Sequence, residues 1–120
     1  MTEKKSTCLP RLMKAFGYSY EGLKAAYASE AAFRQELLLL AVGVPIACLL
    51  DVSAEARAIM IGSLVLILLV EIINTAIEAT IERISADQHP LSKKAKDLGS
   101  AAVFISLFHA FVIWVVVLAS

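Results

Sequence analysis

The stretch that decides the fold is "AIMIGSLVLILLVEIINTAIEATIE", which runs from Ala58 to Glu82. Its first part, Ala58 to Val70, is apolar apart from one glycine and one serine. In a helix that rises about 1.5 Å per residue, such a run covers about two thirds of the hydrocarbon core of a bilayer. The helical pattern then continues, without Pro or Gly, into a segment that carries Glu71, Glu78 and Glu82. The stretch therefore predicts a membrane helix that leaves the bilayer as a face of carboxylates.

The polar side chains of this helix share one side. At about 100° per residue, Glu71, Asn74, Glu78 and Glu82 fall within a narrow sector of the helix surface. If Glu78 lies at the level of the lipid headgroups, Glu71 lies more than one turn inside the hydrocarbon. A carboxylate at that depth is costly and indicates a functional site. The alternative is a structural one, in which the face makes polar contacts between helices or pairs with Arg or Lys for assembly.

The composition favours a membrane protein. The chain has 120 residues, of which 59% are hydrophobic, and its formal net charge is zero. Its mean hydropathy is +0.77. Soluble domains are only about 45–50% apolar, so the hydrophobic fraction of this chain is high. This length allows a single domain, and a chain so short buries little of its own surface, which favours oligomers. The charge balance gives no basic field for nucleic acid. Cys8 and Cys48 are expected to be free thiols.

Three spans are predicted, at about residues 31–50, 54–81 and 98–119. Pro45 should kink the first span, and Asp51 or Ser53 should cap the second. Residues 1–29 are predicted to form a separate amphipathic helix, and residues 30–120 the three-span membrane domain. We therefore predict an all-α membrane protein with three transmembrane helices and an N-terminal surface helix.

The N-terminal segment has an apolar face of its own. Met13, Phe16, Tyr20, Leu23 and Tyr27 recur at spacings of three and four residues. An aromatic-rich face with basic flanks is typical of a helix that lies in the membrane surface. The alternative is a helix that packs on protein.

The basic residues predict the orientation of the chain. Lys and Arg are frequent before the first span and between the second and third spans, whereas the loop between the first two spans and its flanks have only Arg57. The positive-inside rule then places the N-terminus in the cytoplasm and the C-terminus outside. The polar clusters all fall on the cytoplasmic side.

The residues by themselves leave the chemistry open. Glu30 and Glu36 flank the start of the first span, and Lys96 and Asp97 precede the third. Carboxylates for Mg²⁺, a lysine for phosphate charge and one carboxylate base describe a phosphoryl-transfer site. The nucleotide motifs G-x-x-x-x-G-K-[ST] and G-x-G-x-x-G are absent from the sequence. A proton pathway or a small ion-coupled transporter would use the same ingredients.

Three stretches make the sequence more specific. "EAAFRQE" (residues 30–36), "VEIINTAIEATIERI" (70–84) and "LSKKAKDLGSAAV" (91–103) resemble the signature stretches of the prokaryotic integral-membrane diacylglycerol kinases. The resemblance implies a homotrimeric bundle in the cell inner membrane with active sites at subunit interfaces. It also implies ATP-dependent phosphorylation of diacylglycerol to phosphatidic acid. One branch of the family phosphorylates undecaprenol, which is the alternative substrate, and a non-enzymatic proton-conducting or assembly module is the further alternative.

The resemblance also implies roles for individual residues. Glu71 matches the general base, Asn74 the residue that orients substrate or phosphate, and Glu30 and Glu78 the carboxylates that hold Mg²⁺. The remaining positions that match nucleotide-contacting residues are Arg11, Tyr18, Asp87, Gln88, His89, Lys96 and Asp97. The positions that match lipid-contacting or supporting residues are Arg34, Gln35, Glu36, Arg57, Ser100 and Trp114, with Arg11 and Glu71 also touching substrate. The loop at residues 87–90 departs from the family's usual sequence.

Overall fold

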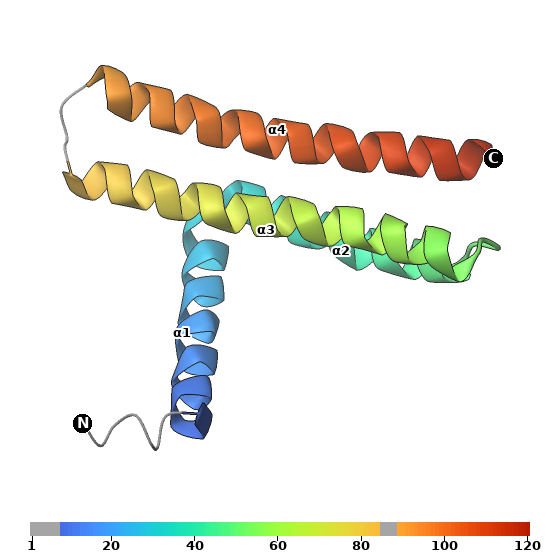
Figure 1. The fold of residues 1–120 in the computed structure, drawn as a ribbon, viewed down its shortest axis with the longest axis horizontal. Coiled ribbons are helices and arrows are strands. Elements are labelled where there is room, and N and C mark those ends of the chain that lie inside the picture. The colour runs from blue at the N-terminus through green and yellow to red at the C-terminus, as the bar shows by residue number, and fades with distance from the viewer. Residues whose placement is uncertain (1–7, 85–88) are drawn as a thin grey trace. The chain divides into compact units, whose positions relative to one another are not determined.

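A computed structural model describes residues 8–84 and 89–120, which form four helices (Figure 1). They are α1 (Cys8–Ser29), α2 (Ala31–Leu49), α3 (Ala54–Ile84) and α4 (Pro90–Ala119). By length and composition, α2, α3 and α4 could each cross a membrane. The predicted all-helical architecture with three candidate spans is therefore confirmed, while the homotrimer stays a prediction.

The chain divides into two compact units, Met1–Ala31 and Ala32–Ser120, and each is described by itself. The first unit contains α1. The side chains that form its predicted apolar face are all exposed: Met13, Phe16, Tyr20, Leu23 and Tyr27. The ammonium group of Lys24 lies 6.0 Å from the centre of the Tyr20 ring. An exposed aromatic face bordered by a cation is what a helix in the membrane surface requires.

In the second unit, Ser53 begins α3. Its hydroxyl accepts a hydrogen bond from the backbone N–H of Ala56 at 3.1 Å, and its carbonyl accepts from the N–H of Arg57 at 2.9 Å. This is the geometry of an N-cap, which satisfies donors that the first turn leaves without a helical partner. Of the two predicted caps, Ser53 is thus the one used. α2 continues as a helix through Pro45 to Leu49.

Arg57 joins the end of α2 to the start of α3. Its Nε donates to the carbonyl of Ala47 at 2.9 Å, and its Nη2 donates to the carbonyls of Leu50 at 2.8 Å and Val52 at 3.3 Å. The last carbonyls of a helix have no partner in the helix itself. Arg57 supplies donors to that end of α2 and to the loop that follows, so it fixes the turn between the two helices.

Helices α3 and α4 pack against each other along their lengths and run in opposite directions (Figure 1). Leu64 and Ile67 of α3 and Ala110 of α4 form the buried centre of the interface. Leu40 and Val44 of α2 and Trp114 of α4 pack against this centre from its edges. The outward faces stay apolar and exposed, as on Phe104, Phe108 and Phe111 of α4. That distribution is expected of helices whose surroundings are lipid.

α4 includes a charged segment before its apolar part. The span was predicted from residue 98, and the helix that contains it starts at Pro90. His89 is the N-cap, and its Nδ1 accepts a hydrogen bond from the N–H of Leu91 at 3.1 Å. Pro at the first position costs no hydrogen bond, because that N–H has no partner in a helix. The lysine-rich segment that follows is therefore helical, and its side chains take positions set by the helix.

Candidate active site

The carboxylate face of α3 is graded in exposure. Glu71 is 5% exposed and Asn74 is 8% exposed, whereas Glu78 is half-buried and Glu82 is exposed. The face thus begins inside the helix bundle of the second unit and ends at its surface. The two buried members are polar groups in an apolar setting, so their partners determine what they can do.

Glu71 has partners on two sides. The hydroxyl of Thr75, one turn further along α3, donates to Oε2 of Glu71 at 3.4 Å. On a second side, Glu36 of α2 lies near enough for the two carboxyl groups to interact. Two ionised carboxylates repel each other at short range, so a proton or a cation between them would be favourable. One oxygen of Glu36, Oε1, is buried and has no hydrogen-bond partner in the described part of the chain. The pair therefore places two carboxyl groups and a buried acceptor together in an apolar setting.

Asn74 is the second buried polar group. Within residues 8–84 and 89–120 its side chain makes no hydrogen bond, and its Oδ1 is buried without a partner. This oxygen lies directly against Gly99 of α4, which is itself buried. A buried amide without partners is costly, at about 1–3 kcal/mol for each unsatisfied group. The amide N–H groups of Asn74, which also make no hydrogen bond within the described residues, are the part of this side chain that could bind a ligand.

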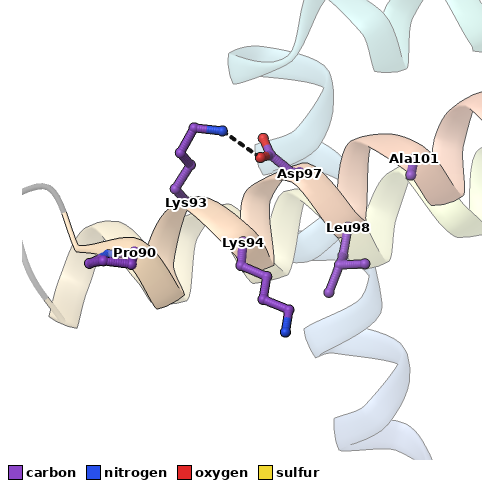
Figure 2. A pocket seen from close by; sticks show the side chains of 6 residues that line it. All are labelled: Pro90, Lys93, Lys94, Asp97, Leu98 and Ala101. Carbon is purple, nitrogen blue, oxygen red and sulfur yellow. Dashed lines mark hydrogen bonds and ion pairs between the residues drawn. The ribbon is translucent and has the colours of Figure 1, made fainter.

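The first turns of α4 carry the cations. Lys93 and Asp97 form an ion pair with Nζ and Oδ2 2.7 Å apart, and both side chains are exposed. Figure 2 shows this pair on one side of the helix, with Lys94 and Leu98 pointing to the other. Together they line an open pocket formed by Pro90, Lys93, Lys94, Asp97, Leu98 and Ala101. An exposed ion pair of this kind contributes little to stability, so a charged ligand can replace either partner.

Lys96 and Glu78 have no such partner. Lys96 is exposed and Glu78 is half-buried, and neither makes an ion pair or hydrogen bond within the described residues. No group of three His, Cys, Asp or Glu residues in that part of the chain could hold a metal ion by itself. Magnesium bound with a nucleotide generally uses one or two protein carboxylates, water and phosphate oxygens. The uncommitted carboxylate of Glu78 fits such an ion.

The predicted lipid residues fall into two groups. Glu36 lies with Glu71, and Arg34, Gln35 and Ser100 are exposed. Arg57 and Trp114 lie at the other end, where Trp114 Nε1 donates to the carbonyl of Met60 at 3.3 Å. Met60 precedes Glu71 by eleven residues of α3, about 16 Å along the axis. The polar groups of Arg57 and Trp114 thus serve the packing of helices far from the carboxylates.

The other predicted nucleotide residues lie elsewhere in the chain. Arg11 and Tyr18 are exposed on α1, and Glu30 is half-buried at the end of the first unit. Asp87 and Gln88 lie outside the described residues. His89 is exposed, but its Nδ1 is occupied as the cap of α4. Arg11, Tyr18 and Glu30 thus belong to the first unit, whereas the carboxylate face and the first turns of α4 belong to the second.

Two residues of this region, Thr75 and Gly99, were missed by the sequence analysis. Thr75 lies four residues from Glu71, a spacing that puts the two side chains on one helical face. That signal was available in the sequence. Gly99 was missed because its importance depends on its contact with Asn74 on another helix. Residue spacing along one helix does not show which residues of α3 and α4 lie side by side.

Comparison with known proteins covers almost the whole chain. The model of the family described as "Prokaryotic diacylglycerol kinase" matches residues 17–118. The chain is 52% identical over 115 residues to the diacylglycerol kinase of Pseudomonas aeruginosa, covering 96% of this chain and 94% of that protein. It is 49% identical over 113 residues to the diacylglycerol kinase of Escherichia coli K12, covering 94% and 93%. For the diacylglycerol kinase of Haemophilus influenzae the identity is 38% over 110 residues, covering 92% and 93%.

Proposed function

This chain belongs to the prokaryotic diacylglycerol kinase family, and from that premise we propose how its buried carboxyl group performs the reaction. The activity is that of a diacylglycerol kinase, a lipid kinase. The hydroxyl oxygen of diacylglycerol attacks the γ-phosphorus of ATP, and the bond from that phosphorus to the bridging oxygen of ADP breaks. The products are phosphatidic acid, ADP and the hydroxyl proton, and Glu71 takes that proton.

The observation that carries this mechanism is the setting of Glu71. Its carboxyl group is almost fully buried, it accepts a hydrogen bond from Thr75, and it lies near Glu36. An ionised Glu71 in this position could accept the proton of the lipid hydroxyl. A base held in position at the lipid hydroxyl contributes through proximity and proton transfer together. Phosphoryl transfer needs little else from a protein than positioning and charge neutralisation.

The nucleotide is proposed to bind where the carboxylate face meets the first turns of α4. Lys96 would neutralise phosphate charge, and Asp97 would exchange its surface partner Lys93 for the nucleotide or its ion. Glu78, with Glu30, would hold Mg²⁺, whose charge stabilises the phosphates during transfer. Arg11, Tyr18 and His89, together with Asp87 and Gln88, are the further residues proposed to contact ATP.

The lipid is proposed to enter from the bilayer. Arg34, Gln35 and Ser100 would contact its polar end near Glu36 and Glu71, where Asn74 would orient the hydroxyl or the γ-phosphate. Because the polar groups of Arg57 and Trp114 are used in helix packing, we assign these two residues a supporting role. The trimer, the cytoplasmic N-terminus and the inner-membrane location are part of the same proposal.

Glu71→Gln tests the proposed base. Glutamine keeps the shape of the side chain but cannot accept the hydroxyl proton, so kcat should fall by about 10²-fold or more. ADP release is measured in detergent micelles with ATP, Mg²⁺ and diacylglycerol, and the elution volume of the variant reports its assembly. Wild-type turnover in a correctly assembled variant would remove Glu71 from the mechanism.

Undecaprenol in a parallel assay of the wild type shows which of the two alcohols is the substrate. If neither lipid causes ADP release from the wild type, a non-enzymatic module is favoured.

A further inference from the structure

We propose that Gly99 is a positioning residue, which fixes the Asn74 amide and the register of α4 on α3 at the reaction site. The proposal rests on the proposed function, because it concerns how Asn74, Glu78 and Lys96 are arranged for phosphoryl transfer. Gly99 is buried, and a methyl group placed on it would overlap Oδ1 of Asn74 and lie 3.1 Å from its Cγ. Only glycine leaves room for this contact.

The contact determines which end of the Asn74 amide a ligand can reach. Oδ1 of Asn74 is enclosed against Gly99, whereas its Nδ2 is not among the buried atoms without a partner. The oxygen end is therefore closed off by α4, and the amide N–H groups are the end that a ligand can reach. An N–H donor suits a substrate oxygen or a phosphate oxygen. Gly99 thus holds Asn74 in the orientation that the proposed role requires.

The same contact sets the alignment of the two helices. Lys96 precedes Gly99 by three residues and lies on the same face of α4, one turn closer to its N-terminus. Glu78 follows Asn74 by four residues and lies one turn closer to the C-terminus of α3. Because α3 and α4 run in opposite directions, pairing Asn74 with Gly99 brings Lys96 and Glu78 to facing turns. A lysine for phosphate and a carboxylate for the ion then flank one space.

The other glycines provide matched controls. A methyl group on Gly62 of α3 meets nothing within 4 Å, so Gly62→Ala should leave activity unchanged and stabilise the helix by about 1 kcal/mol or less. A methyl group on Gly43 of α2 comes 2.5 Å from Cδ1 of Leu64, in the packed region away from the carboxylates. Gly43→Ala should therefore lower Tm without changing kcat per folded molecule.

The first experiment compares the three alanine variants by thermal unfolding and by ADP release. For Gly99→Ala we expect kcat to fall by about 10-fold or more, because small displacements of positioning groups cost that much. KM for ATP should change by less than about threefold. A kcat like that of Gly62→Ala would overturn the proposal. A loss of Tm like that of Gly43→Ala, with normal kcat per folded molecule, would also overturn it, since Gly99 would then serve packing alone.

A second experiment tests the contact independently of turnover. Asn74→Ala removes the amide that the added methyl group would strike, so Gly99→Ala should lower Tm in the wild-type background but not in Asn74→Ala. Such non-additivity is expected only of residues in contact, and additive changes would overturn the contact. Wild-type turnover of Asn74→Ala would overturn the positioning role. Glu71→Gln tests the proposed base separately. If Glu71 proves not to be the base, the Tm coupling between Asn74 and Gly99 is still expected.

Discussion

At the scale of single residues, Glu71 illustrates why a carboxyl group can remain inside a membrane helix. Its burial is costly unless hydrogen bonds compensate, and the Thr75 hydroxyl donates one. The same contact keeps the side chain from rotating toward other polar groups. The hydrogen bond that lowers the cost of burial thus also restrains the side chain that we propose as the base.

Thr75 should matter for turnover through its hydroxyl group. Thr75→Val keeps the size and branching of the side chain but removes the donor to Glu71, so the carboxyl group loses this restraint. We expect kcat to fall by about 3- to 10-fold, the effect of one weakened positioning contact. Thr75→Ser retains the hydroxyl and should stay near wild type. The measurement is ADP release with diacylglycerol at saturating ATP, and equal rates for the two variants would show that the hydroxyl has no positioning role.

At the scale of the helices, hydrophobic period and length predicted most of the architecture. The carboxylate face of α3 followed from spacing alone, because one helix determines it. The start of α4 did not follow from hydropathy, because the segment from Pro90 to Asp97 is charged and hydropathy detects only the apolar part of the helix. The pairs Glu36–Glu71 and Asn74–Gly99 could not be predicted, because each depends on the offset and rotation of one helix relative to another. Spacing within one helix contains no information about that alignment.

The link between α2 and α3 leads to a prediction for Arg57. Its guanidinium group satisfies three carbonyls at once, which lysine, with a compact ammonium group, cannot reproduce. Arg57→Ala and Arg57→Lys should both destabilise the protein, by about 1–3 kcal/mol for the alanine variant. Thermal unfolding in detergent measures this, and kcat per folded molecule should remain that of the wild type. An unchanged Tm with a raised KM for diacylglycerol would instead assign Arg57 to lipid binding.

At the scale of the whole molecule, the charges are divided between the two ends of the spans. Of the eleven Lys and Arg residues, Arg57 is the one that lies beside the loop between the first two spans, in the first turn of α3. Even this cation is partly withdrawn from solvent, because its donors bind backbone carbonyls. This end therefore presents almost no positive charge, and the positive-inside rule predicts that it faces out. The proposed site residues Glu71, Glu78 and Lys96 lie toward the opposite ends of α3 and α4.

This asymmetry predicts that Ser120 is outside the cell and Cys8 inside. A chain with Cys8→Ser, Cys48→Ser and Ser120→Cys should react with a membrane-impermeant maleimide on intact cells, because the C-terminus follows a third crossing. The matched variant, Cys48→Ser alone, retains only Cys8 on the exposed α1 and should react only after the membrane is permeabilised. Both variants must keep diacylglycerol-dependent ADP release, which shows that the labelled molecules are folded. Labelling of Cys8 on intact cells would reverse the orientation and place the ATP-binding residues on a side without ATP.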